Sequence, residues 1–231
     1  MKKLAGVIAG LATLGATVGA EAAVWRFDGV LPGPSAVDVP INATTPCGTP
    51  NFDFCDVNGA GLQYAAQGGV SLLAQGLANG MPAELIQDIQ GINQGLGVQS
   101  EGRFLLDQVN GAAGESILFT FSEEVTVSFV EFNDGIGQDC PGGGVEGDCG
   151  TFDLLIDAGL ATETTLSGIT ALAVVAGGWV GTTFEFIHNE TSGGFSIAAI
   201  ATPLPAALPM FIAGAGMLGA AARRRKKALA K

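Results

Sequence analysis

The chain of 231 residues is long enough for one medium-sized domain with additional segments at its ends. Its net charge is −12, and residues 23–222, with 21 of the 22 acidic residues and only Arg26 and Arg103 as basic ones, carry −19. Such an anionic surface argues against nucleic acid and anionic lipid headgroups as partners, and it favours divalent cations or cationic polymers.

Residues 1–22 have the parts of a secretory signal peptide. Lys2 and Lys3 precede an apolar stretch, and small residues stand at Ala20 and Ala22, the two positions that a signal peptidase inspects. We therefore expect export and cleavage just before Ala23. The alternative is an uncleaved membrane helix, which is less favoured because four glycines interrupt the stretch and no stop-transfer charge follows it.

Residues 23–201 are predicted to form the exported domain, in which apolar and polar residues mostly alternate. This alternation predicts half-buried β-strands with one wet face. The segments concerned are residues 25–28, 117–122 and 124–129, and further candidates are 103–109, 151–156, 171–175, 182–187 and 194–201. Short turns rich in Gly, Asn and Asp separate them. The pattern predicts an all-β fold, an antiparallel β-sandwich or jelly roll.

Residues 59–99 differ, because they are rich in Gly, Ala and Gln. Within them, the segment NGMPAELIQDIQG predicts a short helix that has Pro82 in its first turn and ends at Gly91. Leu85 and Ile89 would share one face of this helix. The remainder is compatible with strands or an ordered loop.

The four cysteines form two close pairs, Cys47 with Cys55 and Cys140 with Cys149. Four cysteines allow three connectivities, and the sequence does not choose among them. We favour two local disulfides, because each would close a turn rich in Gly or Pro in an exported chain. The alternative is a zinc site, but neither pair has the short spacing of a zinc knuckle.

Residues 202–231 form a separate C-terminal segment. Residues 203–222 contain no charge, and as a helix they would be about 30 Å long, which matches the hydrocarbon core of a bilayer. A basic cluster follows and should stay on the cytoplasmic side; it consists of Arg223, Arg224, Arg225, Lys226 and Lys227. Pro203 and Pro205 favour an extended backbone just outside the membrane, which is the conformation that a protease binds.

The order of proline motif, apolar segment and basic cluster resembles the C-terminal sorting signal of PEP-CTERM proteins, in the variant with the signature Val-Pro-Leu-Pro-Ala (VPLPA-CTERM). The matching motif is Thr202, Pro203, Leu204, Pro205 and Ala206. Thr202 replaces the usual Val, and Leu204 replaces the Glu of the founding form. Residues 95–135 are also similar to the sandwich region of many such exported proteins.

The resemblance implies that the chain is an exosortase substrate. An exosortase is a membrane cysteine transpeptidase that cuts near the motif and passes the protein to the cell surface or to the exopolysaccharide matrix. The departures at Thr202 and Leu204 leave the scissile bond and the exosortase subtype open. Before cutting, the precursor would be tethered to the inner membrane by its C-terminal helix.

The exported domain lacks a recognisable catalytic set. His188 is the only histidine in the chain, and we expect it at the surface, at the end of a strand. Glu123 and Glu124 are adjacent, so their side chains should point to opposite sides of a strand. We therefore predict that the protein is not an enzyme, and a glycan hydrolase is disfavoured.

A Ca²⁺ site is the main binding hypothesis. A Cys140–Cys149 bridge would draw together four carboxylates, hard oxygen ligands that suit Ca²⁺, namely Asp134, Asp139, Glu146 and Asp148. A solvated acidic loop is the simpler interpretation. A second acidic group surrounds Cys55 and comprises Asp53, Asp56 and Asn58.

Carbohydrate binding usually needs exposed Trp or Tyr side chains, and the domain offers Trp25, Trp179 and Tyr64. Overall, we predict an exported structural protein of the surface or extracellular matrix that meets signal peptidase, an exosortase and exopolysaccharide. The alternative is a Ca²⁺-binding or carbohydrate-binding module held at the cell surface.

Overall fold

The structure is a computed structural model. It describes residues 22–28, 40–44, 54–57, 59–88, 95–99, 109, 114–133, 151–170, 178–189 and 194–203. The elements within these ranges are all β-strands, and none of the ranges contains a helix that is long and apolar enough to cross a bilayer. The predicted signal peptide and C-terminal membrane helix lie outside the described residues, apart from Ala22 at the end of the former and Pro203 at the start of the latter.

Twelve strands follow one another along the described parts of the chain. They are β1 (Ala22–Arg26), β2 (Phe54–Val57), β3 (Leu62–Gln67), β4 (Val70–Ala78), β5 (Met81–Asp88), β6 (Gly95–Gln99), β7 (Glu115–Val127), β8 (Phe129–Asn133), β9 (Thr151–Ile156), β10 (Thr164–Thr170), β11 (Trp179–His188) and β12 (Ser196–Pro203). Residues 22–204 form one compact unit.

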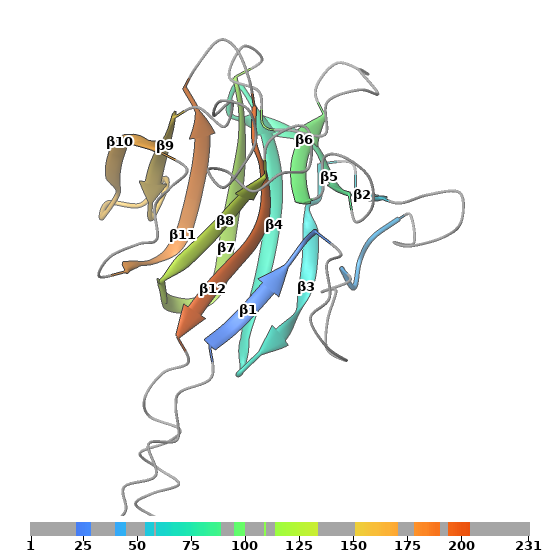
Figure 1. Ribbon diagram of the computed structural model, residues 1–231, viewed down its shortest axis with the longest axis horizontal. Helices are drawn as coiled ribbons and strands as arrows, with labels where there is room; N and C mark the ends of the chain where they lie inside the picture. Colours follow the sequence, from blue (N-terminus) through green and yellow to red (C-terminus); the bar gives the residue numbers. More distant parts are fainter. Residues whose placement is uncertain are drawn as a thin grey trace, which may run out of the picture. The chain divides into compact units, whose positions relative to one another are not determined.

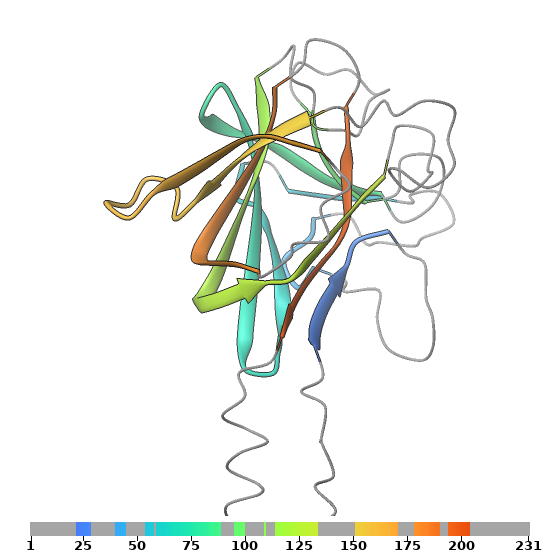
Figure 2. The same ribbon diagram turned by 60° about the vertical axis from the view of Figure 1, so that its left-hand side comes forward.

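The strands pair antiparallel, in the order β1-β12-β6-β5-β4-β7-β11-β9-β10. Beside this path, β2 pairs with β5, β3 with β4 and β8 with β12. The sheet curls, so that β1, β12 and β8 lie across from β4, β7 and β11 (Figures 1 and 2). The prediction of an all-β antiparallel fold is confirmed.

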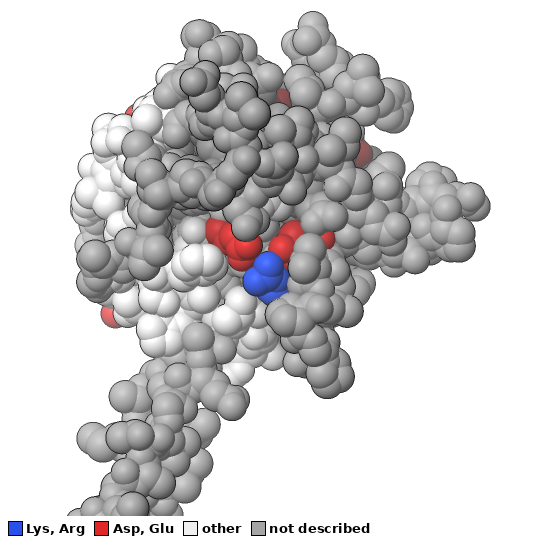
Figure 3. All heavy atoms as spheres, viewed as in Figure 1, with Lys and Arg blue, Asp and Glu red and all other residues white. Residues whose placement is uncertain are grey.

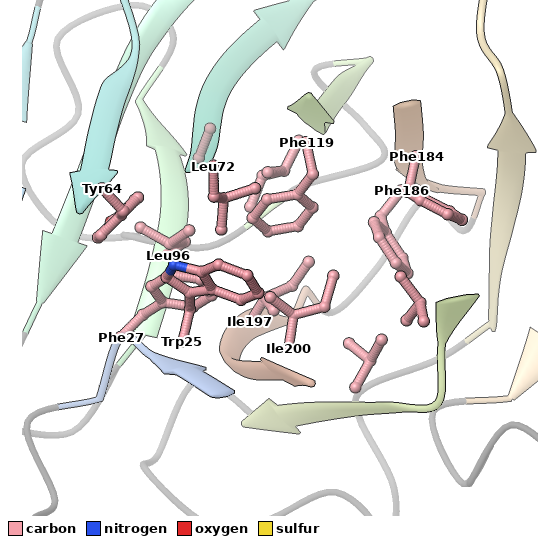
Figure 4. Close-up of a cluster of buried hydrophobic side chains, with 14 of the residues drawn as sticks. Trp25, Phe27, Tyr64, Leu72, Leu96, Phe119, Phe184, Phe186, Ile197 and Ile200 are labelled. Carbon is pink, nitrogen blue, oxygen red and sulfur yellow. The ribbon is translucent and has the colours of Figure 1, made fainter. Parts of the chain in front are cut away.

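The core fills the inside of this curl (Figure 4). On β7 the alternation places Ile117, Phe119 and Phe121 inside, as the sequence predicted. Trp25 of β1 meets Phe121 of β7 edge to face, with the ring centroids 5.6 Å apart. Such aromatic contacts across the curl bury large apolar areas, which stabilises the fold.

The alternation changes phase between β7 and β8. Val127 is buried, Ser128 interrupts the strand, and Val130 and Phe132 are the next buried positions. The Ser128 N–H donates to the carbonyl of Ala201 at 2.9 Å, which holds the break against β12. Phe129 is therefore half-buried, although the sequence pattern placed it on the same face as Val125 and Val127.

The predicted helix at NGMPAELIQDIQG is wrong, because residues 81–88 form strand β5. Asn79 and Gly80, with φ of 51° and 73°, form the two-residue turn of a β4–β5 hairpin. Positive φ at both turn residues is the type I′ geometry that Asn-Gly favours, and this signal outweighs the helix pattern. Pro82 is tolerated because the pair next to the turn, Leu77 with Pro82, exchanges no hydrogen bonds in such a hairpin.

The other strand predictions agree closely where residues are described. The segment 151–156 is found with the predicted bounds, and 182–187 and 194–201 lie largely in β11 and β12. Val109 forms a bridge with Phe195, whereas the rest of 103–109 and all of 171–175 lie outside the described residues. Between residues 59 and 99 the structure has β3, β4, β5 and β6, which agrees with the strand alternative for that segment.

The hairpin can be tested at Gly80. Gly80→Ala should destabilise the protein by about 1 kcal/mol, because an L side chain disfavours positive φ. No atom lies within 4 Å of the added Cβ, so the cost is that of the backbone alone. Gly80→Asn should cost less, because Asn tolerates this conformation. The measurement is the urea midpoint, and a higher midpoint for Gly80→Ala would instead support a helix.

Candidate processing site

The pairing of β1 with β12 brings the two predicted processing regions together. Ala22 pairs with Pro203 and Ala23 with Thr202. The expected signal-peptidase bond, between Ala22 and Ala23, therefore lies opposite the first two residues of the sorting motif. β1 and β12 run side by side in Figure 2, the former in blue and the latter in red-brown.

The motif begins inside the folded unit. Thr202 is only 2% exposed, whereas Pro203, the last residue of β12, is exposed. Both residues have the extended conformation that the sequence predicted. Leu204, Pro205 and Ala206 lie outside the described residues.

The free edge of β1 is covered by the side chain of Gln67 from β3. Gln67 Nε2 donates to the Val24 carbonyl at 2.8 Å, and the Val24 N–H donates to Gln67 Oε1 at 3.1 Å. The amide side chain thus takes the place of a neighbouring strand for one residue. An open sheet edge tends to pair with other chains, and this contact blocks part of it.

Trp25 anchors β1 to the core. Its side chain is fully buried, and its indole N–H donates to the Ala65 carbonyl of β3 at 3.3 Å. β1 is therefore bound to β12 through the backbone and to β3 through the side chains of Trp25 and Gln67. These contacts close one side of the curl.

Arg26 is the one basic residue in the described ranges, and it lies between two carboxylates. Its guanidinium is 2.7 Å from Asp28 and 3.3 Å from Glu131 of β8. The hydrogen bond with Asp28 raises the pKa of Arg26 above its ordinary value. Figure 3 shows a basic group, in blue, next to acidic ones, in red.

Asp28 does not belong to the wet face that the alternation predicted, because it is 3% exposed. It is buried where the chain leaves β1, and the neighbouring guanidinium compensates its charge. A buried carboxylate needs such a partner because losing its hydration is costly.

The prediction of a surface histidine is wrong, because His188 is 2% exposed. It ends β11, where its register partner in β9 is Phe152 and its ring lies 5.6 Å from the ring of Phe195. The signal missed by sequence reasoning is that His188 continues the alternation of Phe184 and Phe186, both of which point inward. Its place in the core agrees with a packing role.

The aromatic residues considered for sugar stacking are also mostly buried. Trp25 and Tyr64 are inside the core, and Tyr64 donates to Gln87 Oε1 at 2.7 Å. Trp179 is half-buried beside Phe186, with 6.3 Å between ring centroids. Glu123 and Glu124, by contrast, are exposed on β7.

Asp157 has a role that sequence reasoning missed. Its carboxylate accepts from the Thr182 N–H at 2.8 Å, the Thr182 hydroxyl at 3.1 Å and the Thr162 hydroxyl at 3.2 Å. These bonds tie the β9–β10 turn to β11. They lower the pKa of Asp157, with the backbone N–H of Thr182 as the largest cause.

Several predicted site residues lie outside the described ranges. They are Ala20, Cys47, Cys140, Cys149, Arg223, Arg224, Arg225, Lys226, Lys227 and the Ca²⁺ candidates Asp134, Asp139, Glu146 and Asp148. Cys55 is buried in β2 and is not a free thiol. Because its partner is not among the described residues, the disulfide pairing stays a prediction. No group of three or more possible metal ligands occurs in the described ranges.

Removing the Arg26 guanidinium should destabilise the domain. Arg26→Ala leaves the Asp28 carboxylate buried without this partner, and we expect a loss of roughly 2 kcal/mol in the free energy of unfolding. Glu131→Gln is the matched control, because it removes the longer contact of a more exposed acid and should cost under about 1 kcal/mol. Urea unfolding measures both, and equal losses would contradict the assigned role of Asp28.

Asp157 should make stability depend on acid pH. Because its pKa is lower in the folded protein than in the unfolded chain, its contribution is fully present above about pH 4 and is lost as pH falls through the folded value. Asp157→Asn keeps the shape and the tolerance of positive φ but removes this contribution. The difference in urea midpoint between wild type and Asp157→Asn should therefore narrow from pH 7 to pH 2, and a difference that stays constant over this range would contradict the assigned role of Asp157.

Comparisons with known proteins leave the chain without an assigned family. Neither the protein-family models, nor the curated proteins, nor the solved structures contain a match to it. Any functional assignment therefore depends on the residues themselves, and above all on the pairing of β1 with β12.

Proposed function

We propose that the protein is an exported structural component of the cell surface or extracellular matrix, processed at both ends. Signal peptidase cuts before Ala23, and an exosortase cuts in the C-terminal segment after the domain has folded. The observation that carries the proposal is the register of β1 and β12, which sets Ala22 opposite Pro203 and Ala23 opposite Thr202.

The bounds of the compact unit support this division of the chain. β1 begins at Ala22 and β12 ends at Pro203, so the described strands include the expected signal-peptidase bond and reach into the sorting motif. A domain that ends there can keep its core intact when either terminal segment is removed. The net charge of −19 on residues 23–222 would favour solubility outside the cell.

We assign the curled antiparallel sheet to the β-sandwich or jelly-roll class. Aromatic contacts between opposite parts of the curl support this assignment, for example Phe132 of β8 with Phe186 of β11, at 6.0 Å between centroids. A non-catalytic role is supported by the use of the polar groups described above. Asp28 binds Arg26, Gln67 binds Val24 and Asp157 binds Thr182, so each of these polar groups has a structural partner within the domain.

The mature protein should begin at Ala23 and lack the basic cluster. The experiment is intact-mass analysis of the full chain expressed in a bacterium that has an exosortase and exopolysaccharide. Pro205→Ala should slow C-terminal processing, and Pro209→Ala, outside the motif, is its matched control.

Deletion of the exosortase should leave the tail uncut and the protein in the membrane fraction. A mature chain that still contains Arg223 in the exosortase-bearing host would refute the sorting proposal. Release into the matrix fraction, together with loss of the tail, is the expected result.

A further inference from the structure

We infer that β1 is a clamp on the sorting motif: while β1 is paired with β12, the chain cannot be cut on the N-terminal side of Pro203. The sorting enzyme therefore acts on a bond C-terminal to Pro203. The part that concerns the sorting enzyme rests on the proposed function, whereas the clamp rests on strand pairing alone.

Both backbone edges of β12 are occupied just before Pro203. On one edge, β1 pairs from Ala199 to Pro203. On the other, the Ala201 carbonyl accepts from the N–H and the hydroxyl of Ser128, at 2.9 and 3.3 Å. A protease binds its substrate as an extended strand with a free edge, and this stretch offers none.

The clamp is held by side chains as well as by its own ladder. Val24 sits opposite Ala201 in the register, yet its N–H and carbonyl both bind Gln67. This pair therefore exchanges no ladder bonds, and the ladder bonds of β1 fall to its neighbours Ala23 and Trp25. Opening β1 means breaking the Gln67 contacts and withdrawing the buried Trp25 ring.

Signal-peptide removal leaves the ladder bonds of the clamp in place. Five register pairs join β1 to β12, and cleavage before Ala23 takes away only the pair of Ala22 with Pro203. The Ala22–Pro203 pair, like Val24–Ala201, exchanges no ladder bonds, because bonded and non-bonded pairs alternate, and Ala23 still holds Thr202. Processing at the N-terminus thus leaves the residues before Pro203 protected.

The cut itself is an ordinary acyl transfer. The C–N bond of the scissile peptide breaks, its carbonyl carbon bonds to water or to an amine or hydroxyl of the matrix, and the departing nitrogen takes a proton. The clamp takes no part in this chemistry and acts only on which bond is presented.

The first test uses purified full-length protein and a protease of elastase specificity, which cuts after small residues. Wild type should resist cutting after Ala199 and Ala201. In Gln67→Ala the open form of β1 should be more populated, and cutting at these bonds should be roughly tenfold faster, because two hydrogen bonds are lost. Fragment masses identify the bonds.

Gln63→Ala is the matched control. Gln63 is also a glutamine of β3, but its amide binds the Tyr64 and Leu72 carbonyls, at 3.3 and 3.0 Å, and not β1. It should leave the cutting rate after Ala201 unchanged. Near-UV circular dichroism shows whether both variants keep the packed core. If Gln67→Ala loses its packed core, hydrogen exchange at Val24 and Thr202 in the wild-type protein measures the opening of β1 directly.

The second test is the mature C-terminus in the exosortase-bearing host. Wild type should end at Pro203 or later, and Gln67→Ala should add products that end before it. Wild-type cutting after Ala201 as fast as in Gln67→Ala would overturn the clamp. Protection from elastase together with a retained Arg223 would refute the proposed function but not the clamp, and a wild-type C-terminus before Pro203 would overturn the inference itself.

Discussion

The antiparallel pairing of β1 with β12 is the constraint on which the rest of the arrangement depends. It joins residues about 180 positions apart, Ala22 and Pro203, and it seats Trp25 in the core opposite Phe121. Because β12 also pairs with β8, the C-terminal strand is bound on both edges. Closing so long a loop is slow and entropically costly, so the core is completed only when the last strand of the domain is in place.

This constraint is reinforced by polar contacts around β1. The edge of β1 is satisfied by one amide side chain, and the charge of Asp28 is compensated by a guanidinium two residues away. The amide reaches β1 from β3, whereas the guanidinium belongs to the last residue of β1. The β1–β12 pair therefore combines strand pairing, side-chain packing and charge compensation in one short region.

Sequence patterns predicted the strands where alternation is clean, as in β7 and β9, because burial on one face imposes a period of two. They failed at β5, where helix-like spacing around Pro82 and Leu85 concealed the Asn79-Gly80 turn signal. They also failed at His188, whose residue type suggested the surface although its position continued an inward-facing row. The usual location of histidine at the surface was a weaker guide there than the alternation of inward-facing residues along the strand.

The site was predictable only in part. Thr202, Ala22 and Ala23 were predicted from linear motifs, which are local patterns in the sequence. Their adjacency, and the contact of Gln67 with Val24, arise from strand order, which no local pattern encodes. Asp157 was missed for the same reason, since its partner Thr182 belongs to a distant strand.

The double pairing of β12 has a mechanical consequence. In a protein held by its C-terminus, tension enters at Thr202 and runs along β12. β1 and β8 lie alongside this strand, so the load stretches their ladders in shear, and many hydrogen bonds resist together rather than breaking one after another. A strand in this position resists unfolding when a force is applied at the C-terminal end of the domain.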